Sequence, residues 1–214
     1  MSTRNIDVAR IAGLVRREVR HFEREGRAAS VVVASRVYAT DVDDLWHAVT
    51  SKERIPRWFL PIEGELQLNG RFQFKDNAGG TITACAAPTA FSATWEFGGD
   101  TSWIAVTLAA EAKGTRLTLE HTAFTDNPHF AKYGPGAVGI GWDMGLLGLH
   151  LYIEEGGNFV TQAEAMAWAM SDNGKSYQRQ SNDGWCDADV KAGRAASDAR
   201  DRADNTIKAY LGEA

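Results

Sequence analysis

The chain has 214 residues, of which 44% are hydrophobic and 24% charged, and its formal net charge is −5 at pH 7. This composition is typical of a globular protein and excludes a fibrous or wholly disordered one. A net negative charge gives no general attraction to phosphate backbones or anionic lipid, so neither nucleic acid nor membrane is a predicted partner. The length suffices for one large core, and we predict one domain with extensions.

The two cysteines, Cys85 and Cys186, lie far apart and outside any C-x-x-C spacing. We therefore expect free thiols, with neither a zinc site nor a disulfide. Charged residues interrupt every apolar segment, so the sequence predicts neither a signal peptide nor a membrane span. These observations favour a cytoplasmic protein.

Residues 5–27 predict an amphipathic helix, because apolar side chains recur at intervals of three and four residues. These side chains are Ile11, Leu14, Val15, Val19 and Phe22. Glutamates are mixed among the arginines of the opposite side, which is typical of a solvated helix face rather than of a nucleic-acid arm. We assign residues 1–29 to this helix and expect it to dock by its apolar stripe.

A strand and two helices are predicted next. Residues 31–40, VVVASRVYAT, are rich in β-branched side chains and favour a strand. Thr40 or Asp41 can cap a helix over DVDDLWHAV, whose early aspartates suit the positive end of a helix. A second short helix is expected over SKERIPRWF.

From residue 62 to 124 the apolar period becomes two, and the turn sequences LNG, NAGG, PT, GGD and KGT separate six segments. This pattern predicts six strands in an antiparallel meander. Alternation places apolar side chains on one face of the sheet and polar ones on the other, as expected when helices cover a single face. His121 falls on the apolar face with Leu117 and Leu119.

The segment GWDMGLLGLHLYIE, residues 141–154, predicts a long helix with Trp142, Leu146, Leu149 and Ile153 on one side. Gly145 and Gly148 each cost about 1 kcal/mol of helix stability relative to alanine. We expect them to permit either a close backbone approach or a space beside the helix. His150 lies off the apolar stripe, so we expect it to be exposed.

Residues 158–214 change composition towards Ala, Asp, Asn and Gln, and we assign them to a helical extension. Apolar residues at helical spacing predict one helix around Met166 and Met170 and another around Ile207 and Leu211. The intervening SDNGKSYQRQSNDGW has little apolar periodicity, so helix and loop both stay open.

The order of these elements resembles the helix-grip fold of the START-like, Bet v-type (SRPBCC) superfamily, an α+β fold. VVVASRVYATDVDDLWHAVTSKERIPRWFLP is similar to the first segment of the proteins related to the activator of the heat-shock-protein-90 ATPase. TRLTLEHTAF is similar to their last strand, and GWDMGLLGLHLYIE to their closing helix. We assign residues 30–157 to this domain; the eukaryotic activators' separate N-terminal domain has no counterpart in the first 30 residues.

The resemblance implies a curved antiparallel sheet wrapped around the long helix, with a cavity that in many relatives admits a small apolar molecule. An aromatic row on a strand is equally compatible with a filled core. The candidate cavity residues are Trp58, Phe72, Phe74, Phe91, Trp95, Leu117, Leu119, His121, Trp142, Leu146 and Leu149.

Our hypothesis from the sequence is therefore a non-enzymatic, cytoplasmic protein that binds a small apolar molecule, with a connection to stress response. No nucleophile elbow, phosphate loop or metal-binding pattern is present, and no catalytic residue, cofactor or metal is predicted. One alternative is a cyclase- or dehydratase-like enzyme with His121 as acid or base. For His121 itself we favour the structural interpretation, a histidine hydrogen-bonded to a nearby hydroxyl or backbone group. A second alternative is a module that contacts a chaperone, or pairs with a second copy through the helical extensions.

Overall fold

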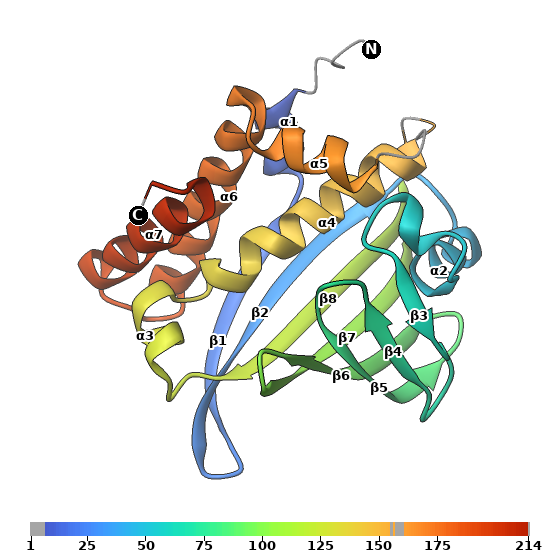
Figure 1. Cartoon of the computed structure of the whole chain (residues 1–214), viewed down its shortest axis with the longest axis horizontal. Coiled ribbons are helices and arrows are strands. Elements are labelled where there is room, and N and C mark those ends of the chain that lie inside the picture. Colours follow the sequence, from blue (N-terminus) through green and yellow to red (C-terminus); the bar gives the residue numbers. More distant parts are fainter. Residues whose placement is uncertain (1–6, 155, 157–160, 214) are drawn as a thin grey trace.

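The computed structural model describes residues 7–154, 156 and 161–213. It contains one curved antiparallel sheet with the strand order β1-β2-β8-β7-β6-β5-β4-β3 (Figure 1). The strands are β1 (Arg16–Arg24), β2 (Arg27–Tyr38), β3 (Ile62–Gly64), β4 (Arg71–Phe74), β5 (Gly79–Ala86), β6 (Ala90–Phe97), β7 (Asp100–Glu111) and β8 (Gly114–Phe124). The predicted α+β helix-grip fold and the meander of six strands are confirmed.

The predicted N-terminal helix over residues 5–27 is wrong for most of its length. Residues 5 and 6 lie outside the described residues, and of the rest only α1 (Val8–Gly13) is helical. β1 and β2 form a hairpin closed by Glu25 and Gly26, both at positive φ. Two consecutive residues at positive φ fit the type of turn that matches strand twist. Val15 and Val19 are four residues apart, an even number, so this spacing puts them on one face of a strand as readily as on one side of a helix.

In the part of the chain that the structure describes, seven further helical segments follow the hairpin: α2 (Val42–Thr50), a single 3₁₀ turn η1 (Ile55–Arg57), α3 (Pro128–Tyr133), α4 (Gly136–Glu154), α5 (Gln162–Ala169), α6 (Asp172–Lys191) and α7 (Ala196–Leu211). The side chain of Asp41 caps α2 by accepting from the backbone N–H of Asp44, as its sequence predicted. The expected helix over SKERIPRWF shortens to the 3₁₀ turn. None of the described helices is long and apolar enough to cross a membrane.

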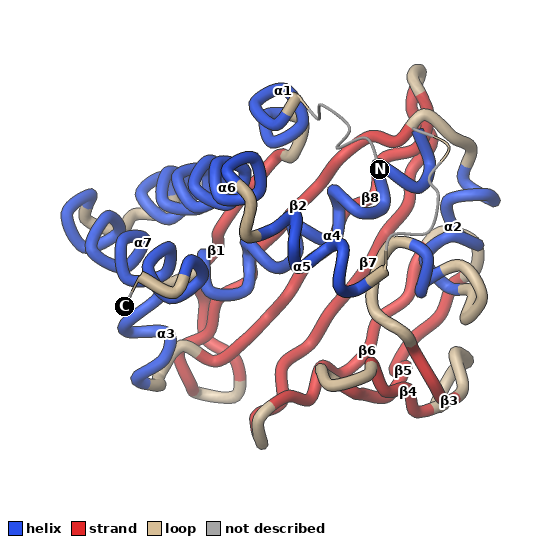
Figure 2. The backbone as a smooth tube through the Cα atoms, turned by 45° about the horizontal axis from the view of Figure 1, so that its top comes forward, coloured by secondary structure: helices blue, strands red, loops and turns tan. Residues whose placement is uncertain are grey.

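Helix α4 lies across the concave face of the sheet, as the tube view shows (Figure 2). Its glycines allow the segment after η1 to approach closely. A Cβ at Gly148 would collide with the carbonyl oxygen of Trp58, and one at Gly145 would lie 3.3 Å from the Phe59 ring. Gly148 thus shows the expected close backbone approach, whereas Gly145 borders the Phe59 side chain and a cavity beside the helix.

The C-terminal helices fold back onto the other side of α4 and onto β1 (Figure 1). The segment left open as helix or loop is α6, and its Trp185 is fully buried in the same apolar cluster as Val19 and Leu149. Ile207 and Leu211 of α7 pack against Ile140 of α4. The extension therefore shares the core of the sheet domain.

Candidate ligand cavity

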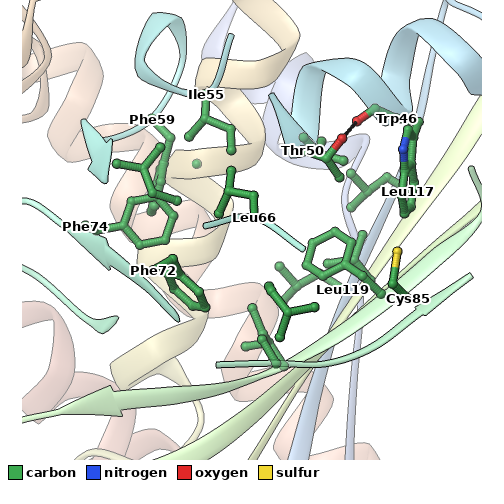
Figure 3. A pocket seen from close by; sticks show the side chains of 18 of the residues that line it. Trp46, Thr50, Ile55, Phe59, Leu66, Phe72, Phe74, Cys85, Leu117 and Leu119 are labelled. Carbon is green, nitrogen blue, oxygen red and sulfur yellow. Dashed lines mark hydrogen bonds between the residues drawn. The ribbon is translucent and has the colours of Figure 1, made fainter. Parts of the chain in front are cut away.

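A cavity of about 430 Å³ lies between the concave face of the sheet, α2, the η1 segment and α4. Figure 3 shows it from close by, with Phe59, Phe72 and Phe74 on one side and Trp46, Leu117 and Cys85 on the other. Its lining residues are Trp46, Val49, Thr50, Ile55, Trp58, Phe59, Ile62, Leu66, Gln67, Leu68, Phe72, Phe74, Ile82, Cys85, Ala87, Phe91, Ala93, Trp95, Ile104, Val106, Leu117, Leu119, Trp142, Gly145, Leu146 and Leu149.

The structure brings ten of the eleven sequence-predicted site residues to the wall of this cavity. His121 is the exception, because it lies behind the wall. Sequence reasoning missed the contributions of α2 and of the loop between β3 and β4, which supply Trp46 and residues 66–68. Trp46 lies within the helix predicted over DVDDLWHAV, but a place on a helix alone does not separate a cavity wall from a filled core.

Aromatic rings pack against one another around the wall. The Trp95 and Trp142 rings lie 4.9 Å apart between centroids, and the Phe59 ring meets Phe74 edge-on at 5.1 Å. The Phe59 and Trp142 rings stack at 6.4 Å. Such pairs contribute about 0.5–1.5 kcal/mol each beyond the burial of their area, so they stabilise the wall.

The wall offers a bound molecule almost no polar contact. Among the described residues that line the cavity, none carries a charge. The indole N–H of Trp58 donates to the carbonyl oxygen of Ala48 at 2.9 Å, and the Thr50 hydroxyl donates to the carbonyl oxygen of Trp46 at 2.7 Å. These donors are used within the protein, so the interior of the cavity suits hydrocarbon.

His121 sits in a hydrogen-bonded chain behind the wall. The indole N–H of Trp142 donates to Nδ1 of His121 at 2.9 Å, and Nε2 lies 2.8 Å from Oγ of Ser102. Because an indole can only donate, Nδ1 is the acceptor and Nε2 carries the proton. Oγ of Ser102 in turn donates to the carbonyl oxygen of Trp95 at 3.0 Å. His121 thus links two tryptophans of the wall.

Burial determines the charge of His121, whose side chain is 5% exposed. Desolvation of the imidazolium lowers its pKa to about 4, so the ring is neutral at neutral pH. Both ring nitrogens already have partners. Of the two interpretations that the sequence left open, the structure matches the histidine bonded to a nearby hydroxyl.

The cavity opens to solvent where the β3–β4 loop, the end of α2 and the end of β5 meet. The lining residues exposed at this mouth are Gln67, Leu68, Cys85 and Ala87. Cys85 and Cys186 are both free thiols, as predicted, but only Cys85 is exposed. Among the described residues, no cluster of three or more His, Cys, Asp or Glu side chains could hold a metal ion.

The side of α4 that faces away from the cavity carries a buried polar cluster. The carboxylate of Asp143, which is 0% exposed, accepts hydrogen bonds from Arg17 at 2.7 Å, from Trp185 at 3.2 Å and from the hydroxyl of Ser181. Burial raises the pKa of Asp143, while Arg17 and the two hydrogen bonds oppose this rise. The cluster joins β1, α4 and α6.

The expectation that His150 is exposed is wrong, since its exposed fraction is 2%. Helix α4 is covered by the sheet on one side and by the helical extension on the other. Residues off the apolar stripe are therefore buried as well. Nδ1 of His150 lies 3.3 Å from a carboxylate oxygen of Glu154, one turn later in the helix.

Residues 39–154 match the family model described as "Activator of Hsp90 ATPase homolog 1-like protein". The chain belongs to this family. The matched residues run from the start of α2 to the end of α4, so they contain every element that lines the cavity. No curated protein sequence matches the chain.

Solved structures extend this comparison beyond the Hsp90-activator-like segment. The crystal structure of CalU16 from Micromonospora echinospora is 26% identical, with a TM-score of 0.67, over 81% of this chain and 97% of that one. Residues 1–154, up to the end of α4, make up 72% of the chain, which is less than the 81% that the match covers. The match to CalU16 therefore continues past α4 into the helical extension.

A second structure shares the fold at lower identity. EF2215 from Enterococcus faecalis, described as a conserved protein of unknown function, is 19% identical with a TM-score of 0.58. The match covers 90% of this chain and 100% of EF2215. The arrangement of sheet, α4 and much of the extension thus recurs in a protein of very different sequence.

Proposed function

We propose that this protein binds a small hydrophobic molecule in the cavity between the sheet and α4, without chemistry of its own. The observation that carries the proposal is the space of about 430 Å³ with an uncharged, largely aromatic wall and a mouth open to solvent. Ligand cavities of proteins usually measure about 300–1,000 Å³ and have mostly apolar walls. A solid core would leave no space of this size, because protein interiors are close-packed.

The position of His121 argues against the enzymatic alternative. A general acid or base must reach the reacting atoms within hydrogen-bond distance, directly or through one water. His121 does not line the cavity, and Trp142 and Ser102 occupy its two ring nitrogens. The arrangement instead suits a positioning residue for the Trp142 ring.

Contact with a chaperone, pairing with a second copy, a role in stress response and a cytoplasmic location stay predictions. The buried positions of Ile207 and Leu211 mean that the apolar stripe of α7 is already covered within one chain. Self-association through that stripe is therefore not needed to bury it.

Titration of the purified protein with the neutral fluorescent dye Nile red tests binding directly. We expect saturable binding of one dye per chain and a blue-shifted emission from the apolar site. Native mass spectrometry of the protein as purified checks for a molecule retained from the cell. Absence of both dye binding and any retained molecule would contradict the proposal.

The exposed thiol of Cys85 provides a control for the location of the dye. Labelling with a bulky pyrene maleimide should modify Cys85 and leave the buried Cys186 intact. Because Cys85 lines the mouth, the label should weaken dye binding by at least about tenfold, corresponding to roughly 1.4 kcal/mol. The variant Cys85→Ser, treated with the same reagent, should bind the dye as the untreated protein does.

A further inference from the structure

The size and polarity of the cavity restrict the class of molecule that fits it, and this inference rests on the proposed function. A cavity of ~150 Å³ holds one benzene molecule. The present cavity, at about 430 Å³, is roughly three times as large. Its wall has no charged side chain among the described residues, so a charged group placed inside would lose its hydration without compensation.

The wall favours a rigid ring system over a flexible acyl chain. Rings such as Trp95 and Trp142 present both faces and edges, which pair well with the faces and edges of another aromatic ring. A long alkyl chain of the same volume would also lose the freedom of each of its rotatable bonds on binding. A planar body of about three fused rings satisfies both conditions.

The loop between β3 and β4 holds one polar side chain, Gln67, at the mouth. The backbone N–H of Asn69 donates to the carbonyl oxygen of Ile82 at 2.8 Å. The N–H of Ile82 donates to the carbonyl oxygen of Gly70 at 3.0 Å. The N–H of Gly70 donates to the carbonyl oxygen of Gln67 at 2.8 Å. These bonds fix the loop against β5, so the backbone of Gln67 has a defined position beside the cavity.

The amide of Gln67 is oriented by its neighbour. Its Nε2 donates to a carboxylate oxygen of Glu65 at 3.1 Å, and a carboxylate can only accept, so the amide oxygen points elsewhere. Within the described part of the chain, no group donates to Oε1 of Gln67. Gln67 therefore offers an acceptor to a ligand, and the charge of Glu65 beside it disfavours an anionic group there.

We propose that the cavity selects an uncharged molecule of about three fused rings, inserted with its apolar end first and with a hydroxyl at the mouth that donates to Oε1 of Gln67. Gln67 is then a specificity-determining residue. Fatty acids and other carboxylates are disfavoured by the same arrangement.

A matched series on one ring scaffold tests this proposal. The probes are anthracene, 2-hydroxyanthracene, 2-methoxyanthracene and 2-anthracenecarboxylate, and their binding is measured by quenching of tryptophan fluorescence at pH 7. We expect 2-hydroxyanthracene to bind about fivefold more tightly than the methoxy compound, which cannot donate, because one neutral hydrogen bond is lost. The carboxylate should bind about tenfold more weakly than the hydroxy compound.

Substitution identifies the residue responsible. In Gln67→Leu the preference for hydroxyl over methoxy should disappear, whereas the affinity for anthracene should change little. Gln162→Leu, at an exposed position on α5 away from the mouth, is the matched control and should keep the preference. Equal binding of the carboxylate, or an unchanged hydroxyl preference in Gln67→Leu, would overturn the proposal.

Two further outcomes distinguish a failure of the proposed ligand class from a failure of the proposed binding function. If dodecanol binds and none of the ring compounds does, the ring proposal fails, while the proposed binding of a small hydrophobic molecule stands. If Nile red, dodecanol and the ring compounds all fail to bind, both fail together.

Discussion

The two long sides of helix α4 meet very different surroundings. On the side of Trp142, Leu146 and Leu149 the helix faces a hollow with an uncharged wall. On the side of Asp143 and Leu147 it is packed against β1 and α6, with a buried carboxylate held by three donors. One side leaves space and the other fills it with specific polar contacts.

This difference suggests how the protein maintains an open cavity. Residues that border a void lack packing partners on one side, which lowers the stability that they contribute. The closely packed opposite side can offset that loss, and it fixes the position of α4 against the sheet. The helical extension would then be needed for the stability of the cavity domain.

The largest expected effect comes from breaking the polar side. In Asp143→Leu the guanidinium of Arg17, whose side chain is 9% exposed, loses its charge partner, and Ser181 and Trp185 lose an acceptor. We expect the free energy of unfolding to fall by ~3–5 kcal/mol. Urea denaturation monitored by circular dichroism measures it.

The double variant Arg17→Met with Asp143→Leu is the control for this prediction. Removing both partners leaves no buried unpaired charge, so the double variant should be more stable than Asp143→Leu alone. A loss below about 1 kcal/mol in the single variant would mean that the cluster does not hold α4 in place.

Adjacent leucines on the two sides of α4 permit a direct comparison. Leu147 is 3% exposed and packs against Tyr177, whereas Leu146 is 4% exposed and lines the cavity. Truncation to alanine should cost ~3–4 kcal/mol at Leu147 and about 2 kcal/mol at Leu146, where fewer packing contacts are lost. Thermal and urea unfolding of the two variants measure the difference. Equal costs would show that the cavity side is packed as tightly as the other.

The pH dependence of stability tests the role of His121 on the cavity side. An unfolded histidine binds a proton below pH 6.5, while His121 in the folded protein does so only below about 4. Between these values the unfolded state holds more protons, so the contribution of neutral His121 is complete above pH 6.5 and is lost progressively towards pH 4. This loss amounts to about 3 kcal/mol.

Urea denaturation at a series of pH values, with the wild type and His121→Gln compared, isolates this contribution from that of other groups. The variant should show a shallower fall in stability across the same pH range. Parallel curves for the two proteins would contradict a neutral, desolvated His121.

Local signals in the sequence predicted much of this fold. The strands β3–β8 follow from two-residue alternation and turn sequences, and α2 follows from the cap at Asp41 and the aspartates of its first turn. Because hairpin strands and caps involve neighbours in the sequence, their patterns can be read without tertiary information. The inward direction of Phe72, Phe74 and Leu119 was predictable for the same reason.

Features that depend on distant partners were missed. Val15 and Val19 fit either period, and only the Glu25–Gly26 turn indicates the hairpin. The burial of His150 and the docking of Trp185 against Gly139 arise because α6 covers α4, a contact between helices that are distant in the sequence. Whether aromatic side chains fill a core or surround a hollow depends on the spacing of the layers, which the pattern of residues does not contain.

The two outer strands of the sheet have consequences for how the protein behaves at high concentration. Six of the nine residues of β1 are Arg or Glu, and the strand packs against α6. β3 at the other edge has only three residues. Charged or very short edges are poor templates for pairing with a strand from another molecule. The protein can thus keep an apolar interior open to solvent at its mouth while its sheet resists edge-to-edge aggregation.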